Sequence, residues 1–344
     1  MPSVTLIHSY KGQRDTPTLG AKRTWAFTFI NNLSCRSFIG DKLNLAFTPQ
    51  DLLTNEIIPR NTSSEGSNWL EFLTGCFEGS PLNCTQQLWN FAFAGSDIDG
   101  DLLPLHHDFT VPLVDQVAQW VTYGSTVIPH PKNETLTTWW IGINDTGDSN
   151  RNTSITNFTA FWETEMTSYF NAVELAAQHG LMTHLFLNVP PEERSPGSLG
   201  NPGQLKDHIG LFNSVLANHI TQFERSHPGL SKRGSSPYLK QRFTATQLHV
   251  LDSPAEFGFS DVTGYGENFL LWNLHAWACE SLLTYGMVII DSVPVPTQQA
   301  IFGTLHPQAH ADISARPMCI DSGHPTQRVH QLLADAVRDQ LLGV

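Results

Sequence analysis

The sequence predicts an α/β protein built on a doubly wound parallel sheet of about five strands. Two observations lead to this class: short, nearly continuous apolar runs recur along the chain, and segments with helical periodicity separate them. Strands that are buried on both faces carry such continuous apolar runs. The resulting βαβα order requires helices on both faces of a parallel sheet, in which ligands bind outside the carboxyl ends of the strands.

The predicted elements follow one another from residue 36 to the end of the chain. The strand candidates lie at residues 37–40, 88–94, 137–143, 183–189 and 248–252. Apolar residues at spacings of three and four predict helices at residues 67–77, 109–121, 157–180 and 204–224. A last amphipathic helix is predicted after Pro325, a residue that suits the first position of a helix.

Two stretches lack this alternation of strand and helix patterns, and they define the expected domain organisation. Residues 1–24 have no periodicity and are predicted to form an irregular extension. Residues 25–344 are expected to form one domain, which an irregular insertion containing Pro, His and Gly interrupts at about residues 262–318.

Charge and hydrophobicity exclude several classes of partner. The 344-residue chain has a formal net charge of −13 with 19 Lys and Arg residues, and no basic cluster stands out. This balance argues against binding to nucleic acid or to an anionic membrane surface. No apolar run reaches the roughly 18 to 20 residues that are needed to span a bilayer. We therefore expect a soluble protein, and a monomer.

Glycosylation tripeptides and cysteines favour export, although the amino terminus lacks the apolar core and cleavage site of a secretion signal. Seven Asn-x-Ser/Thr tripeptides occur, at Asn32, Asn61, Asn83, Asn133, Asn144, Asn152 and Asn157. Cys76 and Cys84 could close a short loop and Cys279 and Cys319 a longer one, which leaves Cys35 over. Five reduced, buried thiols in a cytosolic protein are the alternative.

Four chemically functional residues follow predicted strands or precede the last helix. Asp321 can accept a hydrogen bond from one ring nitrogen of His324 and leave the other nitrogen as a general base. Gly95 lacks a Cβ, so a backbone N–H there can approach a ligand, and the Asn144 amide can donate to a developing oxyanion. Each residue alone also suits a turn or a helix cap. Together they form the set that acyl transfer requires.

The segments around these residues resemble one known family. They are "NFAFAGSDID", "GIND", "FLNVPPEERSP" and "IDSGHPT", the last running into a helix. In combination they resemble the SGNH, or GDSL, hydrolases, and most closely the secreted fungal acetyl esterases that act on plant cell-wall carbohydrate. The resemblance covers residues 36 to about 260 and residues 319–344. It implies a flavodoxin-like three-layer α/β/α fold, a carbohydrate or small-molecule ester as substrate, secretion, and neither a cofactor nor a metal.

The resemblance also implies roles for individual residues. His324 would be the catalytic base and Asp321 its partner, with Gly95 and Asn144 in the oxyanion hole. The nucleophile of the family is the serine of a Gly-Asp-Ser motif after the first strand. The matching segment here is "SFIGDKLNLAF", in which Lys42 stands at the position of that serine. An amine that attacked an ester would form a stable amide and would not turn over.

Three explanations of Lys42 remain open. The chain is an inactive relative, or the gene model is faulty near residue 42, or another serine takes the role. The other serines considered are Ser9, Ser37 and Ser292.

Two other functions also remain open. A non-catalytic carbohydrate-binding protein would keep the cleft without the chemistry, and the nine tryptophans would allow sugar stacking. A metal-dependent hydrolase would use some of the fifteen histidines, such as His106, His107, His306 and His310. Their spacing does not indicate the three or four converging ligands that a zinc site needs.

Overall fold

The structure is a computed structural model, and it describes nine segments of the chain. These are residues 24–30, of which only the backbone is described, and residues 66–77, 81–106, 110–132, 134–150, 152–227, 251–265, 316–319 and 324–342. The predictions for Lys42, Asp321, Cys35 and Cys279 lie outside the described residues, as does the predicted strand at residues 37–40.

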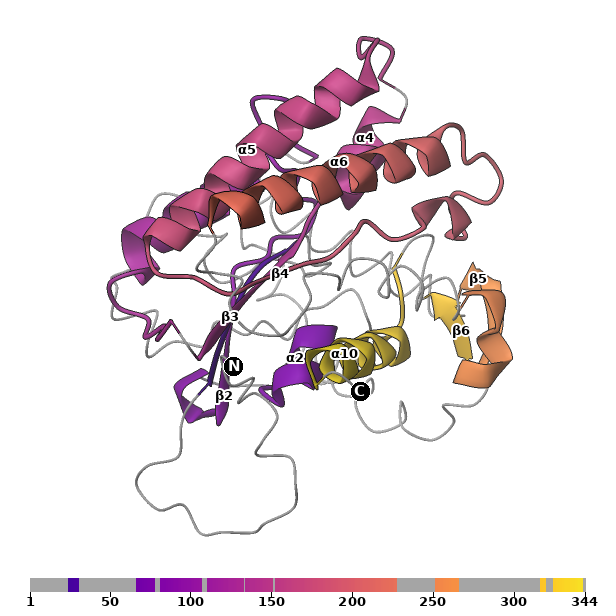
Figure 1. The fold of residues 1–344 in the computed structure, drawn as a ribbon. Coiled ribbons are helices and arrows are strands. Elements are labelled where there is room, and N and C mark those ends of the chain that lie inside the picture. The colour runs from indigo at the N-terminus through magenta and orange to yellow at the C-terminus, as the bar shows by residue number, and fades with distance from the viewer. Residues whose placement is uncertain are drawn as a thin grey trace, which may run out of the picture.

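A four-stranded parallel sheet, with strand order β2-β1-β3-β4, organises the described chain (Figure 1). Its strands are β1 (Thr24–Ile30), β2 (Gln86–Asn90), β3 (Thr135–Trp140) and β4 (His184–Phe186). The central strand β1 pairs with β2 and β3, and it places Thr28 opposite Asn90 and Ile30 opposite Trp140. The carboxyl ends of these three strands therefore lie at one edge of the sheet.

The predicted strands at residues 88–94, 137–143 and 183–189 are confirmed, although each observed strand ends before the predicted one. A strand was also predicted at residues 248–252. This prediction is wrong for Leu251 and Asp252, which are helical. So short an apolar run does not distinguish a strand from a buried helix by its periodicity. Strand β1 was not predicted. It begins at Thr24, the last residue of the stretch that was expected to be irregular.

Helices account for most of the remaining described chain. They are α2 (Trp69–Thr74), α3 (Leu113–Gln119), the π-helical turn η4 (Trp120–Gly124), α4 (Ile143–Ser149), α5 (Phe158–Gln178), α6 (Leu205–Ser226) and α10 (Gln327–Leu342). Three 3₁₀ turns are η3 (Pro81–Asn83), η5 (Glu192–Arg194) and η6 (Pro254–Phe257). The five predicted helices are confirmed, and α4 is an addition to them.

A second, two-stranded parallel sheet pairs β5 (Phe259–Tyr265) with β6 (Arg316–Cys319). These strands lie at the two ends of the stretch, at about residues 262–318, that was predicted to be an irregular insertion. The residues between the two strands lie outside the described chain.

Alternate residues of the main strands enter two separate cores, one on each face of the sheet. Trp89 of β2 and Trp139 of β3 pack in a core with residues of α3, α5 and α6. On the opposite face, Leu88 of β2, Leu136 of β3 and Leu185 of β4 pack in a core with residues of α2 and α10. Figure 1 shows α5 and α6 running side by side, with α2 and α10 together across the sheet from them.

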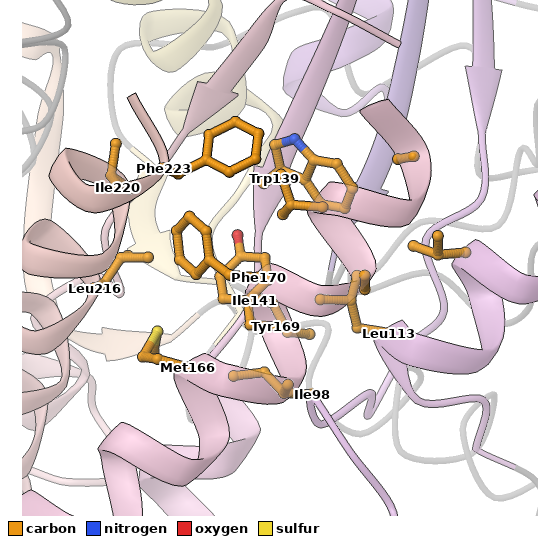
Figure 2. Close-up of a cluster of buried hydrophobic side chains, with 14 of the residues drawn as sticks. Ile98, Leu113, Trp139, Ile141, Met166, Tyr169, Phe170, Leu216, Ile220 and Phe223 are labelled. Carbon is orange, nitrogen blue, oxygen red and sulfur yellow. The ribbon is translucent and has the colours of Figure 1, made fainter. Parts of the chain in front are cut away.

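Aromatic side chains pack together with aliphatic ones in the core beneath α5 and α6 (Figure 2). Trp139 is fully buried, and its ring stacks on that of Phe186 at a centroid distance of 6.2 Å. Phe170 of α5 also stacks on Phe186, at 5.5 Å. Full burial of one large apolar side chain stabilises a fold by roughly 1.5 to 3 kcal/mol. These contacts hold β3, and with it the start of α4, in a fixed position against α5.

Local interactions fix the short helix α2 and the entry to β2. Asn68 and Glu71 form a capping box, in which the Glu71 carboxylate accepts from the Asn68 N–H at 2.6 Å and Asn68 Oδ1 accepts from the Glu71 N–H at 3.1 Å. Cys76 and Cys84 form a disulfide, which confirms this predicted pair.

None of the helices in the described segments is long and apolar enough to cross a membrane.

Candidate functional site

The two predicted oxyanion donors lie beyond the carboxyl edge of the sheet, Gly95 in a loop and Asn144 in the first turn of a helix. Gly95 occupies a turn five residues after β2, where its φ of 76° lies in the left-handed region that favours glycine. Asn144 is the second residue of α4, which begins three residues after β3. Because β1 lies between β2 and β3, these two segments flank the point at which the strand order changes direction, the usual place for a ligand in such a sheet.

A hydrogen bond joins the two segments directly. Asn144 Nδ2 donates to the backbone oxygen of Ser96, the residue after Gly95, at 3.1 Å. An amide group carries two N–H donors, and this bond uses one of them. The adjacent residue Asp145 accepts from the Ile98 N–H at 2.8 Å. Two consecutive residues of α4 therefore hold the turn that contains Gly95.

Three carboxyl groups are buried behind these two segments. Burial raises the pKa of Asp97, of Asp145 and of Glu165 on α5. The charge of Asp145 raises the pKa of Asp97 and of Glu165 further. A raised pKa favours the protonated, neutral form of each carboxyl group.

A histidine–carboxylate pair lies next to Gly95. His106 Nδ1 and Asp148 Oδ2 are 2.8 Å apart, and both side chains are about one third exposed. The hydrogen bond to Asp148 raises the pKa of His106. A Cβ added to Gly95 would lie 3.2 Å from His106 Cδ2, so the imidazole packs against this glycine. Asp148 lies four residues after Asn144, on the same face of α4. This spacing could have identified Asp148 from the sequence, but it was not used.

Glu192 approaches the same helix from the segment that follows β4. Burial and, to a smaller extent, the charges of Asp148 and Glu193 raise its pKa to about 7. A Cβ added to Gly147 would lie 3.7 Å from Glu192 Oε1, which places the carboxylate beside α4. Groups with perturbed pKa values are frequent at functional sites. The sequence identified this segment only through its resemblance to a family.

His324 is the described member of the predicted His–Asp pair, and it lies half-buried just before α10. Burial and, to a smaller extent, the nearby His324 lower the pKa of His330 on α10 to about 4. Asp321 and Lys42 lie outside the described residues. The central strand β1 ends at Ile30, twelve residues before Lys42, whereas the sequence predicted a strand that ended two residues before it.

In the part of the chain that the structure describes, no three His, Cys, Asp or Glu side chains are arranged to hold a metal ion. Of the histidines considered for such a site, His107, His306 and His310 lie outside that part.

No protein-family model matches the chain. The chain is similar to an acetylesterase. This relative comes from Thermothelomyces thermophilus and is 27% identical over 225 residues, which are 63% of this chain and 70% of the relative.

Proposed function

We propose that the protein is an ester hydrolase of the acetyl esterase type that acts on carbohydrate or small acyl esters. The observation that carries the proposal is the hydrogen bond from Asn144 Nδ2 to Ser96 O, because it joins the helix of one candidate oxyanion donor to the loop of the other. The similarity to an acetylesterase over 225 residues supports the same reaction class.

We also propose membership of the SGNH hydrolases and a flavodoxin-like, doubly wound sheet of five strands. The described order β2-β1-β3-β4 agrees with the first four positions of the flavodoxin-like order 2-1-3-4-5. Apolar cores on both faces of the sheet agree with a three-layer arrangement. The Cys76–Cys84 disulfide supports an exported protein, since disulfides persist in oxidising compartments.

The proposed reaction is acyl transfer followed by hydrolysis. The N–H of Gly95 and the amide of Asn144 would donate to the ester carbonyl oxygen as it becomes an oxyanion. His324, oriented by Asp321, would take the proton of the nucleophile and return it to the departing alcohol. His324 would then take a proton from a water molecule, which would attack the acyl group and release it from the nucleophile as the free acid.

The chain as written carries Lys42 at the position of the nucleophilic serine, so we expect little turnover from it. Oxyanion donors and binding alone leave about 10³- to 10⁴-fold catalysis over water, far below a complete triad. This residue is the reason to retain a second candidate function, a non-catalytic carbohydrate-binding protein.

Hydrolysis of p-nitrophenyl acetate by the unmodified chain and four variants tests the proposal. Lys42→Ser is expected to raise the rate, and a further His324→Ala change is expected to abolish the gain. Ser34 lies four residues after the end of β1, the same distance that separates Asn144 from the end of β3. Ser34→Ala in the unmodified chain therefore tests this serine as an alternative nucleophile.

Strong activity of the unmodified chain that survives both His324→Ala and Ser34→Ala would refute the mechanism. Absence of activity in all variants, together with measurable binding of acetylated oligosaccharides, would favour the carbohydrate-binding alternative.

A further inference from the structure

The turn formed by Gly95, Ser96, Asp97 and Ile98 is held by two different helices, of which α4 supplies only one side. We propose that Gln116 of α3 is a positioning residue that sets the orientation of this turn, and thereby of the Gly95 N–H opposite Asn144. This inference rests on the proposed function for its catalytic consequence, whereas its structural part stands on the contacts of Gln116 alone.

The contacts of Gln116 lie inside the protein. Its Nε2 donates to Ser96 Oγ at 2.8 Å and to the backbone oxygen of Val111 at 2.8 Å. Gln116 is 2% exposed and Ser96 is fully buried. Ser96 Oγ also lies 2.7 Å from Phe93 O, before the turn, and 2.8 Å from Val111 O, before α3. The Gln116 amide therefore links Ser96 in the turn to Val111 before α3.

Ser96 receives hydrogen bonds from both helices. Its hydroxyl oxygen accepts from Gln116, and its backbone oxygen accepts from Asn144 Nδ2 at 3.1 Å. The start of α3 adds a third contact, because the Leu113 N–H donates to Asp97 O at 2.9 Å. Loss of the Gln116 contact would allow Ser96 to rotate. The Gly95 N–H and the Asn144 amide would then no longer keep a fixed orientation relative to each other, because Ser96 connects them.

The expected catalytic effect is smaller than that of losing an oxyanion donor. Removal of one such donor costs about 10²- to 10³-fold in kcat. Gln116 acts through Ser96 and leaves both donors in the chain, so we expect a loss of about 10- to 100-fold in kcat. KM is expected to change less than about twofold, since donors that tighten on the transition state contribute little to ground-state binding.

Gln119 offers a matched control on the same helix. It is also a buried glutamine, 7% exposed, and its Nε2 has no hydrogen-bond partner among the described residues. Gln116→Met and Gln119→Met therefore make the same chemical change at two buried sites, of which only one contacts the turn. Ser96→Ala removes the acceptor of the Gln116 bond from the other side.

Two measurements separate the structural part from the catalytic part. Amide hydrogen exchange of residues 95–98 is measured in the full chain, and kcat and KM are measured in the Lys42→Ser background. Gln116→Met is expected to accelerate exchange about tenfold or more relative to Gln119→Met. The double variant Ser96→Ala/Gln116→Met is expected to lose less kcat than the two single losses combined, because the Gln116–Ser96 hydrogen bond is common to both changes.

Unchanged exchange in Gln116→Met would overturn the inference, and so would faster exchange with unchanged kcat in an active background. If Gln116→Met does not fold, exchange and kcat are measured in Ser96→Ala instead, because this change removes the acceptor of the Gln116 hydrogen bond. If the Lys42→Ser background has no esterase activity, the proposed function fails, and the exchange rates still decide whether Gln116 holds the turn.

Discussion

Gly142→Ala is expected to destabilise the protein strongly because this glycine connects β3 to α4, the helix that carries Asn144. Its φ of 114° is a conformation that side-chain-bearing residues rarely adopt. A Cβ at this position would also lie 2.6 Å from Phe212 Cε1 and 2.8 Å from Val189 Cγ2. Phe212 is fully buried and packs against Trp162, so neither neighbour can move away cheaply.

The magnitude follows from two additive effects. A positive φ costs a residue with a Cβ about 1 to 2 kcal/mol, and overpacking of a dense core costs about 1 to 3 kcal/mol more. We therefore expect Gly142→Ala to lower the free energy of unfolding by about 2 to 5 kcal/mol. Gly75→Ala is the matched control, because Gly75 has a φ of 69° but no atom within 4 Å of its added Cβ. Its expected cost is about 1 to 2 kcal/mol.

Urea unfolding, followed by tryptophan fluorescence, measures the difference between the two variants. A difference of about 2 kcal/mol corresponds to a shift of about 0.7 M in the midpoint for an m-value of about 3 kcal/mol/M. Equal midpoints for Gly142→Ala and Gly75→Ala would refute the steric part of the reasoning. Parent-like stability of Gly142→Ala would refute both parts.

Two further predictions concern the region of α2. Replacement of both Cys76 and Cys84 by alanine removes a crosslink of sequence separation 8, which should lower the free energy of unfolding by about 2.5 kcal/mol; a urea midpoint that neither this change nor reduction of the parent shifts would contradict it. Burial raises the pKa of Glu71 from 4.5 to about 7, an effect that the hydrogen bond from the Asn68 N–H partly opposes. The unfolded chain releases this proton near pH 4.5 and the folded chain only near pH 7, so the contribution of Glu71 to stability is present below pH 4.5 and is lost as pH rises to about 7. Glu71→Gln should make the fall in urea midpoint between these two pH values shallower, and an unchanged fall would assign it to other groups.

The sequence by itself determined the elements whose signal is local. Helices α5, α6 and α10 were predictable because their apolar residues repeat at three and four positions over several turns. Strands β2, β3 and β4 were predictable because burial on both faces requires nearly continuous apolar runs. The Cys76–Cys84 pair followed from its short separation. Gly95 and Asn144 could be placed near one another because parallel strands end at one edge of a sheet.

Only the tertiary structure decided the features that depend on distant segments. Residues 24–30 become the central strand because they pair with segments that begin at Gln86 and Thr135, far along the chain. Helix α4 forms from a run with Gly and Asp, whose weak helix propensity is overridden by its place above the sheet. The contact between Gln116 and Ser96 spans 20 residues and leaves no periodic trace in either segment. Such contacts arise from packing in three dimensions, which residue spacing along the chain does not encode.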